Sequence, residues 1–173
     1  MSDWHYKPNI LVPEEETLPR EIKRYAAIVS YDGSGYCGFQ RQKHSHTVQA
    51  ELEDALSFVA GAPVIVAPAG RTDSGVHGDY QVIHFDSQAV RSDQSWIKGG
   101  NSKLPKNINI RWAGQVSPKF HSRFSALSRT YRYVVANTPT RPAACTAATS
   151  VDKSSLPAAS STIEGLILSW PAS

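Results

Sequence analysis

The sequence predicts an α+β domain of the ferredoxin-like, split βαβ kind, with helices on one side of a largely antiparallel sheet. Two observations support this class. Strand and helix patterns follow one another in the order strand, helix, strand, strand, helix, strand. The 173 residues, 40% of them hydrophobic, suffice for one core. Such folds host many functions, so the order of elements predicts the shape before the chemistry.

The first strand and the first helix carry the clearest local signals. Residues 25–31 are rich in β-branched, aromatic and small apolar residues and run into an Asp-Gly turn signal, which predicts a strand. From Thr47, a plausible N-cap, apolar residues recur at helical spacing until Gly61 and Pro63 end the pattern. These residues therefore predict a strand followed by a helix.

The later elements complete the split βαβ order. Strands are predicted at residues 64–67, 80–85, 109–116 and 130–136, and a short helix at residues 92–98. In the last strand Tyr131, Tyr133 and Val135 alternate onto one face. With the helices on one side, the other face of the sheet is expected to be open, and an open sheet face is a common platform for RNA.

Three regions are predicted along the chain. Residues 1–20 contain three prolines and no periodicity, so they are expected to form an extended arm. Residues 21–142 form the predicted domain. Residues 143–173 are a predicted low-complexity tail, because residues 143–162 hold six Ala and eight Ser or Thr, and residues 163–171 are compatible with a terminal strand.

Positive charge gathers in one part of the sequence although the net charge is only +3. Residues 101–150 hold eight Lys or Arg and no Asp or Glu, interleaved with aromatic residues. Such a segment offers cations to phosphates and flat faces to bases. A solvated basic face with aromatic residues in the core fits the same composition, and both interpretations stand at this point.

Composition and motifs exclude several classes of protein. The first residues lack a signal peptide, no window resembles a membrane span, and two cysteines do not make a disulfide framework, so a soluble cytoplasmic protein is expected. Residues 33–38 match G-x-G-x-x-G, but the helix begins too late for a dinucleotide site. His77, His84 and His121 with Asp73 match no metal motif, so no metal is expected.

The segment GRTDSGVHG at residues 70–78 is the most informative motif. An Asp-Ser-Gly sequence is ordinary turn chemistry, and the pattern alone favours a plain turn. Its position between two predicted strands and its three glycines favour a site instead, since glycine lets a ligand approach the backbone closely. A nucleophilic Asp73 must be ionised, which a neighbouring Arg71 guanidinium favours.

Several segments in the same order resemble the tRNA pseudouridine synthase I (TruA) family. They are YDGS with GFQRQ (residues 31–34 and 38–42), TVQ (47–49), GRTDSGVHG (70–78), QVIHF (81–85), Asn101 with LP (104–105), FHSRFSA (120–126) and YRY (131–133). The family usually has Ala at Ser74 and often Trp at Phe39. The matches extend from about residue 24 to residue 142.

The resemblance implies a pseudouridine synthase fold and the isomerisation of uridine in the anticodon stem-loop of tRNA, without a metal or organic cofactor. It implies that Asp73 is the nucleophile, that Arg71 acts in base flipping and that Tyr131 stacks on the uracil. The residues that it implies as tRNA contacts are Arg91, Phe120, His121, Ser122, Arg123 and Phe124. It also implies tRNA as partner and a homodimer.

The family pattern stops after Pro142, whereas family members continue into a second half that completes the cleft. We therefore expect this chain to lack most of that half, either by an internal deletion that keeps the last strand or by a truncation with an unrelated tail. Two alternatives to an active tRNA-uridine isomerase follow. One is a catalytically silent RNA-binding fragment, and the other is a gene product that does not fold stably.

Overall fold

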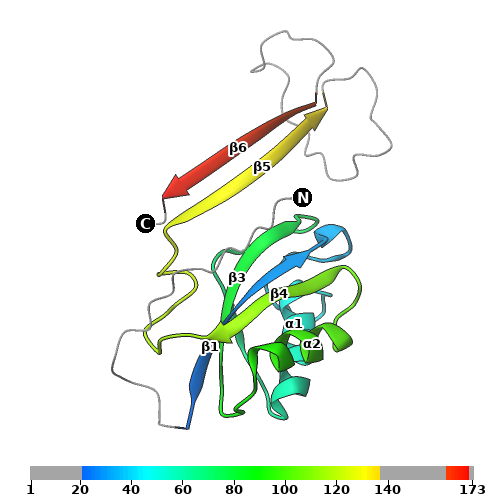
Figure 1. Ribbon diagram of the computed structural model, residues 1–173. Helices are drawn as coiled ribbons and strands as arrows, with labels where there is room; N and C mark the ends of the chain where they lie inside the picture. The colour runs from blue at the N-terminus through cyan, green and yellow to red at the C-terminus, as the bar shows by residue number, and fades with distance from the viewer. Residues whose placement is uncertain (1–20, 137–162, 172–173) are drawn as a thin grey trace.

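The computed structural model describes residues 21–136 and 163–171. The elements are β1 (Lys23–Tyr31), the 3-10 helix η1 (Gly33–Gly35), α1 (Val48–Ala60), β2 (Val66–Pro68), β3 (Gly78–Ser87), α2 (Asp93–Lys103), β4 (Ile108–Gln115), β5 (Ser128–Ala136) and β6 (Ile163–Pro171). Figure 1 shows β1, β3 and β4 side by side with both helices against the sheet, and the β5–β6 pair projecting beyond it.

The four-stranded sheet has the order β2-β3-β1-β4, and each neighbouring pair is antiparallel. This is the strand order of a split βαβ unit, so the predicted α+β class is confirmed. The register of β1 and β3 runs from Lys23↔Ser87 to Tyr31↔Gly78, with an irregularity just before Tyr31. The end of β1 therefore lies beside the start of β3, where the segment of residues 70–78 enters the sheet.

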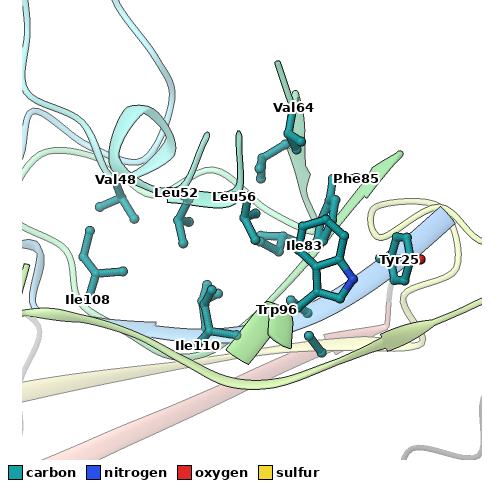
Figure 2. Close-up of a cluster of buried hydrophobic side chains, with 14 of the residues drawn as sticks. Tyr25, Val48, Leu52, Leu56, Val64, Ile83, Phe85, Trp96, Ile108 and Ile110 are labelled. Atoms are coloured by element: carbon teal, nitrogen blue, oxygen red, sulfur yellow. The ribbon is translucent and has the colours of Figure 1, made fainter. Parts of the chain in front are cut away.

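The core lies between the helices and one face of the sheet. Tyr25, Phe85 and Trp96 are at most 2% exposed, and the Trp96 ring centroid lies 5.0 Å from each of the other two rings. Leu52 and Leu56 of α1 are fully buried against the same cluster (Figure 2). Each large apolar side chain buried in this way contributes about 1.5–3 kcal/mol, so this layer fixes the helices on the sheet.

Several predicted boundaries differ from the structure, and the largest difference is at the end of α2, which contains a pair of glycines. The helix continues past Lys98 to Lys103. A β-carbon on Gly99 would lie 2.8 Å from Val59 Cγ2, and one on Gly100 would lie 2.5 Å from Ile110 Cδ1. These glycines therefore let α2 pack closely against α1 and β4. The second strand, predicted at residues 64–67, begins at Val66 and ends at Pro68.

The face of the sheet opposite the helices is less open than predicted. Arg24 of β1 forms two hydrogen bonds with the Asp86 carboxylate, at 2.7 and 2.8 Å. Its Nη1 also donates to the backbone oxygens of Pro118 and Phe120, each at 2.9 Å. The connection between β4 and β5 is thereby held over one end of this face.

The end of the chain pairs with β5. Strands β5 and β6 are antiparallel, with Tyr131 opposite Leu168, so a strand lies where the sequence was compatible with one. The predicted arm (1–20) and the low-complexity residues 143–162 lie outside the described residues, and the division into three regions stays a prediction.

Candidate active site

The loop of residues 69–77, called the Asp73 loop below, joins β2 to β3. Hydrogen bonds from distant parts of the chain hold its backbone. The Phe39 amide donates to the Thr72 carbonyl at 2.9 Å, and Gln81 Nε2 donates to the Gly70 carbonyl at 2.6 Å. Since these donors lie before α1 and on β3, the loop is restrained from two directions.

Tyr31, at the end of β1, forms the floor beneath the Asp73 loop. Its hydroxyl shares a hydrogen bond of 2.9 Å with Thr72 Oγ1. Burial raises the pKa of this hydroxyl above its ordinary value, so Tyr31 stays protonated. A β-carbon on Gly78 would lie 2.5 Å from the Tyr31 ring, so only glycine fits where the loop enters β3.

The glycines of the G-x-G-x-x-G match pack against the Asp73 loop. A β-carbon on Gly33 would lie 2.0 Å from the Val76 carbonyl oxygen. Gly38 has φ +88°, and a β-carbon there would lie 2.8 Å from the Thr72 carbonyl oxygen. Two of these glycines therefore serve contact between two loops, in keeping with the rejection of a dinucleotide site.

Asp73 opens a tight turn. The Val76 amide donates to the Asp73 carbonyl at 3.2 Å, and Gly75 takes φ +79° in the third position of the turn, which favours glycine. Ser74 Oγ donates to the Tyr36 carbonyl at 3.1 Å. The alanine usual in the family could not form this last bond, so the substitution ties the turn to the segment before α1.

The Asp73 carboxylate lies exposed at the tip of this turn, and Arg71 is exposed on the same loop. Within the described residues neither side chain forms an ion pair or hydrogen bond. Arg71 and Asp73 therefore do not pair with each other in this structure. The arrangement leaves a carboxylate available to a ligand on a backbone that is held in place.

Tyr131 lies on β5 and is 41% exposed. Among the described residues no hydrogen bond joins it to Asp73 or Arg71. Its strand is nevertheless tied to the Asp73 loop, because Arg129 donates from Nε and Nη2 to the Ala69 carbonyl at 3.3 and 3.1 Å. The structure thus links the two segments that carry the predicted site residues without bringing the side chains into contact.

Residues 120–125, called the basic turn below, hold five of the predicted tRNA contacts. Phe124 is 77% exposed and Arg123 is exposed, whereas Ser122 is 2% exposed. Ser122 Oγ donates to the Ala67 carbonyl at 2.8 Å and lies 2.9 Å from His84 Nδ1. In this conformation Ser122 anchors the turn, while Arg123 and Phe124 face solvent.

His84 of β3 is the buried partner of the basic turn. Burial, with contributions from nearby His121 and Arg24, lowers the pKa of His84 to about 4, so the ring is neutral. The Ser122 amide donates to its Nδ1 at 3.2 Å. Its ring lies 4.5 Å from His121, whose ring lies 4.4 Å from Phe124, so ring contacts continue from the sheet to the surface. The sequence signal for this role was only that His84 falls within a family segment.

Arg91 lies apart from the other predicted site residues. It follows β3, whereas Asp73 precedes it, and the ten residues of that strand separate them by roughly 30 Å. Its Nε donates to the Val59 carbonyl at 3.2 Å, at the end of α1. A tRNA that contacts both Arg91 and Asp73 therefore has to extend along the whole strand.

The described cations of residues 101–136 do not form one surface. Lys103 lies on α2, with Nζ 4.1 Å from the centre of the Phe58 ring. Arg111 reaches Asp79 on β3 at 3.3 Å, which offsets part of its charge. Some of these cations are thus solvated away from the candidate site, whereas Arg123 is exposed on the basic turn.

The described residues contain no group of three His, Cys, Asp or Glu side chains placed to hold a metal ion. His77 pairs with Asp32 at 3.1 Å, and hydrogen bonds from Ser34 lower the pKa of the Asp32 carboxyl. In the same part of the chain, no helix has the length and apolar character needed to cross a membrane.

Fold and loop together define a class: a split βαβ domain that presents an aspartate on a glycine-rich loop between two strands. A family model described as tRNA pseudouridine synthase matches residues 27–125, more than half of the chain. The chain therefore belongs to the tRNA pseudouridine synthase family, as the sequence resemblance indicated.

Individual relatives agree. The chain is 52% identical over 119 residues to "tRNA pseudouridine synthase A" of Shewanella denitrificans, a match covering 69% of this chain and 46% of the relative. It is 55% identical over 115 residues to the protein of the same name from Actinobacillus pleuropneumoniae, covering 66% and 44%. The matched part thus spans less than half the length of these relatives.

Proposed function

We propose that this chain acts on tRNA as a pseudouridine synthase, isomerising uridine in the anticodon stem-loop with Asp73 as nucleophile. The observation that carries the proposal is the Asp73 loop. Its backbone is held by bonds to Phe39, Gln81 and Arg129, while the Asp73 carboxylate is exposed and unpaired among the described residues. A fixed backbone with a free carboxylate suits a nucleophile, because catalysis depends on positioning.

The proposed reaction balances without a co-reactant. Asp73 attacks either C1′ of the ribose or C6 of the uracil, the bond from C1′ to N1 breaks, and the base turns so that C5 bonds to C1′. The bond between Asp73 and the substrate breaks again before the product leaves, which restores the carboxylate. The C5 proton leaves to a base and N1 gains a proton. The uridine must first leave its stack, which costs a few kcal/mol. Arg71 would fill the vacated space, and Tyr131 would stack on the base and could accept the proton. No metal or organic cofactor is needed for these steps.

The second candidate is a catalytically silent RNA-binding module. It is favoured by the matched part being less than half the length of the relatives, which contain a further part that this match does not cover. Such a module would bind RNA through Arg123 and Phe124, both exposed on the basic turn.

One experiment separates the two candidates. The purified chain is incubated with unmodified tRNA, and pseudouridine is mapped at single-nucleotide resolution for the parent, for Asp73→Asn and for Asp79→Asn. Asp79 is also an exposed aspartate near the start of β3, so its variant is the matched control. We expect product with the parent and with Asp79→Asn, and a loss of at least about a thousandfold with Asp73→Asn.

The two variants should be about equally stable as folded proteins. Asp73 is exposed and unpaired among the described residues, and the ion pair of Asp79 with Arg111 is exposed, so each carboxylate contributes less than about 1 kcal/mol. Product that survives Asp73→Asn would exclude the proposed nucleophile. If the parent chain binds tRNA without modifying it, the result would contradict the enzyme proposal and support the RNA-binding module. A chain without a cooperative thermal transition would instead support the third alternative, an unstable gene product.

We further propose, from the family resemblance, that the chain forms a homodimer. The outer strands β2 and β4 of the four-stranded sheet each have one strand neighbour among the described residues. Unpaired strand edges are available for association. Sedimentation velocity over a range of protein concentrations tests this, and a monomer at all concentrations would contradict it.

A further inference from the structure

Arg129, the second residue of β5, lies where three segments of the molecule meet. Its Nε and Nη2 donate to the Ala69 carbonyl at 3.3 and 3.1 Å, and its Nη2 also donates to the Arg123 carbonyl at 3.1 Å. Ala69 begins the Asp73 loop, and Arg123 lies in the basic turn. One guanidinium therefore connects that loop, the basic turn and the strand that carries Tyr131.

Arg129 contacts the Asp73 loop at its first residue, Ala69. The Ala69 amide donates to the Val82 carbonyl at 2.8 Å, so both backbone groups of Ala69 are bonded when Arg129 is present. The next carbonyl, that of Gly70, accepts from Gln81 at 2.6 Å. Arg129 thus supplies one of two adjacent bonds that hold the backbone just before Arg71.

Gly70 also makes room for the guanidinium. A β-carbon at Gly70 would lie 3.8 Å from Arg129 Nε and 3.9 Å from its Cδ, which is ordinary contact distance. The side chain of Arg129 therefore packs along the loop backbone as well as bonding to it. This packing restricts the direction that β5 can take next to the Asp73 loop.

Strand geometry connects Arg129 to Tyr131. Residues two apart in a strand point to the same face, so Arg129 and Tyr131 share one face of β5. Because Arg129 is bonded to the base of the Asp73 loop, that face of β5 begins against the loop. The direction of the strand at this anchor decides how Tyr131 stands relative to Asp73.

We propose that Arg129 is a positioning residue that sets β5, and with it Tyr131, against the Asp73 loop and the basic turn. The proposal rests on the proposed function, since only a shared uridine requires Tyr131 and Asp73 to keep a defined relation. Arginine suits this role because its planar fork donates to two separate carbonyls at once. A lysine ammonium on a flexible stem would not reproduce both contacts with the same geometry.

The test compares Arg129→Met and Arg129→Lys with Arg111→Met as matched control. Arg111 belongs to the same basic segment and also donates to a backbone carbonyl, that of Asp79, at 3.1 Å. Arg111→Met and Arg129→Met therefore remove the same charge from the chain. Any effect that these two variants share reflects the lost charge. Only a larger effect of Arg129→Met than of Arg111→Met reports positioning.

The first measurement, amide hydrogen exchange by mass spectrometry on the full chain, does not depend on activity. We expect faster exchange in peptides covering residues 66–77 and 121–131 for Arg129→Met, a smaller change for Arg129→Lys, and none for Arg111→Met. Unchanged exchange in both peptides would overturn the proposal. If Arg129→Met does not fold, the charge-conserving Arg129→Lys carries the comparison.

The second measurement is steady-state pseudouridine formation. Misplacing Tyr131 should lower kcat by about tenfold to a hundredfold with a smaller change in KM. An equal effect of Arg111→Met would also overturn the proposal. A parent chain that makes no pseudouridine would refute the proposed function, and the exchange measurement would still decide whether Arg129 holds the two segments together.

Discussion

His84 is the residue whose environment differs most from that of a free side chain. Its ring is 6% exposed, accepts a hydrogen bond from the Ser122 amide at 3.2 Å, and lies beneath the basic turn. The charged groups that face it are His121, Arg24 and Asp86, of which the first two disfavour its protonation and the last favours it. A buried neutral histidine of this kind makes stability depend on pH.

The predicted pH dependence has a defined sign. The pKa of His84 falls from 6.5 to about 4 on folding, so between these values the unfolded chain binds more protons. The free energy of unfolding should therefore decrease as the pH falls through this window, by on the order of 3 kcal/mol in total. Urea unfolding of the parent at pH 7 and at pH 4.5 measures the decrease.

His84→Asn is the comparison for this prediction, because its amide oxygen can accept from Ser122 but does not titrate. The decrease should be clearly smaller in that variant. An equal decrease in both chains would assign the effect to groups other than His84. Asp32 is not among them, because its pKa is lowered from 3.8 by hydrogen bonds from Ser34 and its contribution is lost only below this window.

At the scale of elements, the contact between the glycine-rich turn before α1 and the Asp73 loop decides where the candidate nucleophile stands. Gly38 takes φ +88°, and a β-carbon on this residue would lie only 2.8 Å from the Thr72 carbonyl oxygen. The Phe39 amide then bonds to that same carbonyl at 2.9 Å. The two loops therefore fit only while residue 38 lacks a side chain.

Gly38→Ala should destabilise the protein by about 1–3 kcal/mol, because it combines an unfavourable backbone conformation with a clash against backbone. Gly35→Ala is the matched control, since a β-carbon at Gly35 would meet nothing within 4 Å. Thermal or urea unfolding of both variants checks this prediction. Equal stability of the two would mean that the contact with the Asp73 loop does not constrain residue 38.

Helices and strands were predicted correctly where the residues that determine them lie within the element or at its ends. The helix after Thr47 was recognised from apolar residues at helical spacing, with Thr47 before them and Gly61 after them. In the structure Gly61 ends the helix in the left-handed conformation, at φ 70°. The second helix was predicted to end at Lys98, just before Gly99 and Gly100, but it continues to Lys103. Their contacts with Val59 and Ile110 come from other elements, so nothing in the local sequence reveals them.

At the scale of the whole molecule, the described cations of residues 101–136 are divided between surfaces. Lys103 lies against Phe58 on the helical side, whereas Arg123 stands on the basic turn with its guanidinium 5.9 Å from the Phe124 ring centre. Both pairs join an exposed cation to an exposed aromatic side chain, but only Arg123 lies on the basic turn, which Arg129 connects to the Asp73 loop. RNA binding should therefore depend on where a cation lies as well as on the total charge.

Arg123→Ala should weaken tRNA binding and reduce the slope of log Kd against log salt by about 1, because one phosphate contact is lost. Lys103→Ala removes the same charge from the helical side and should leave the slope nearly unchanged. Fluorescence anisotropy at several salt concentrations measures both variants. Equal slopes in the two variants would show that binding senses net charge without using the basic turn.

The sequence by itself determined the α+β class, the order of the elements and the family, because these depend on periodicity, caps and motifs that lie close together along the chain. It also singled out Asp73, Arg71 and Tyr131, whose roles stay proposals. Only the tertiary structure decided that Arg71 does not pair with Asp73, that Ser122 is an anchor beneath the surface, and that Arg129 links the Asp73 loop to β5. The physical reason is distance along the chain. The bonds that hold the Asp73 loop join residues as many as 60 positions apart, so they exist only once the sheet has formed.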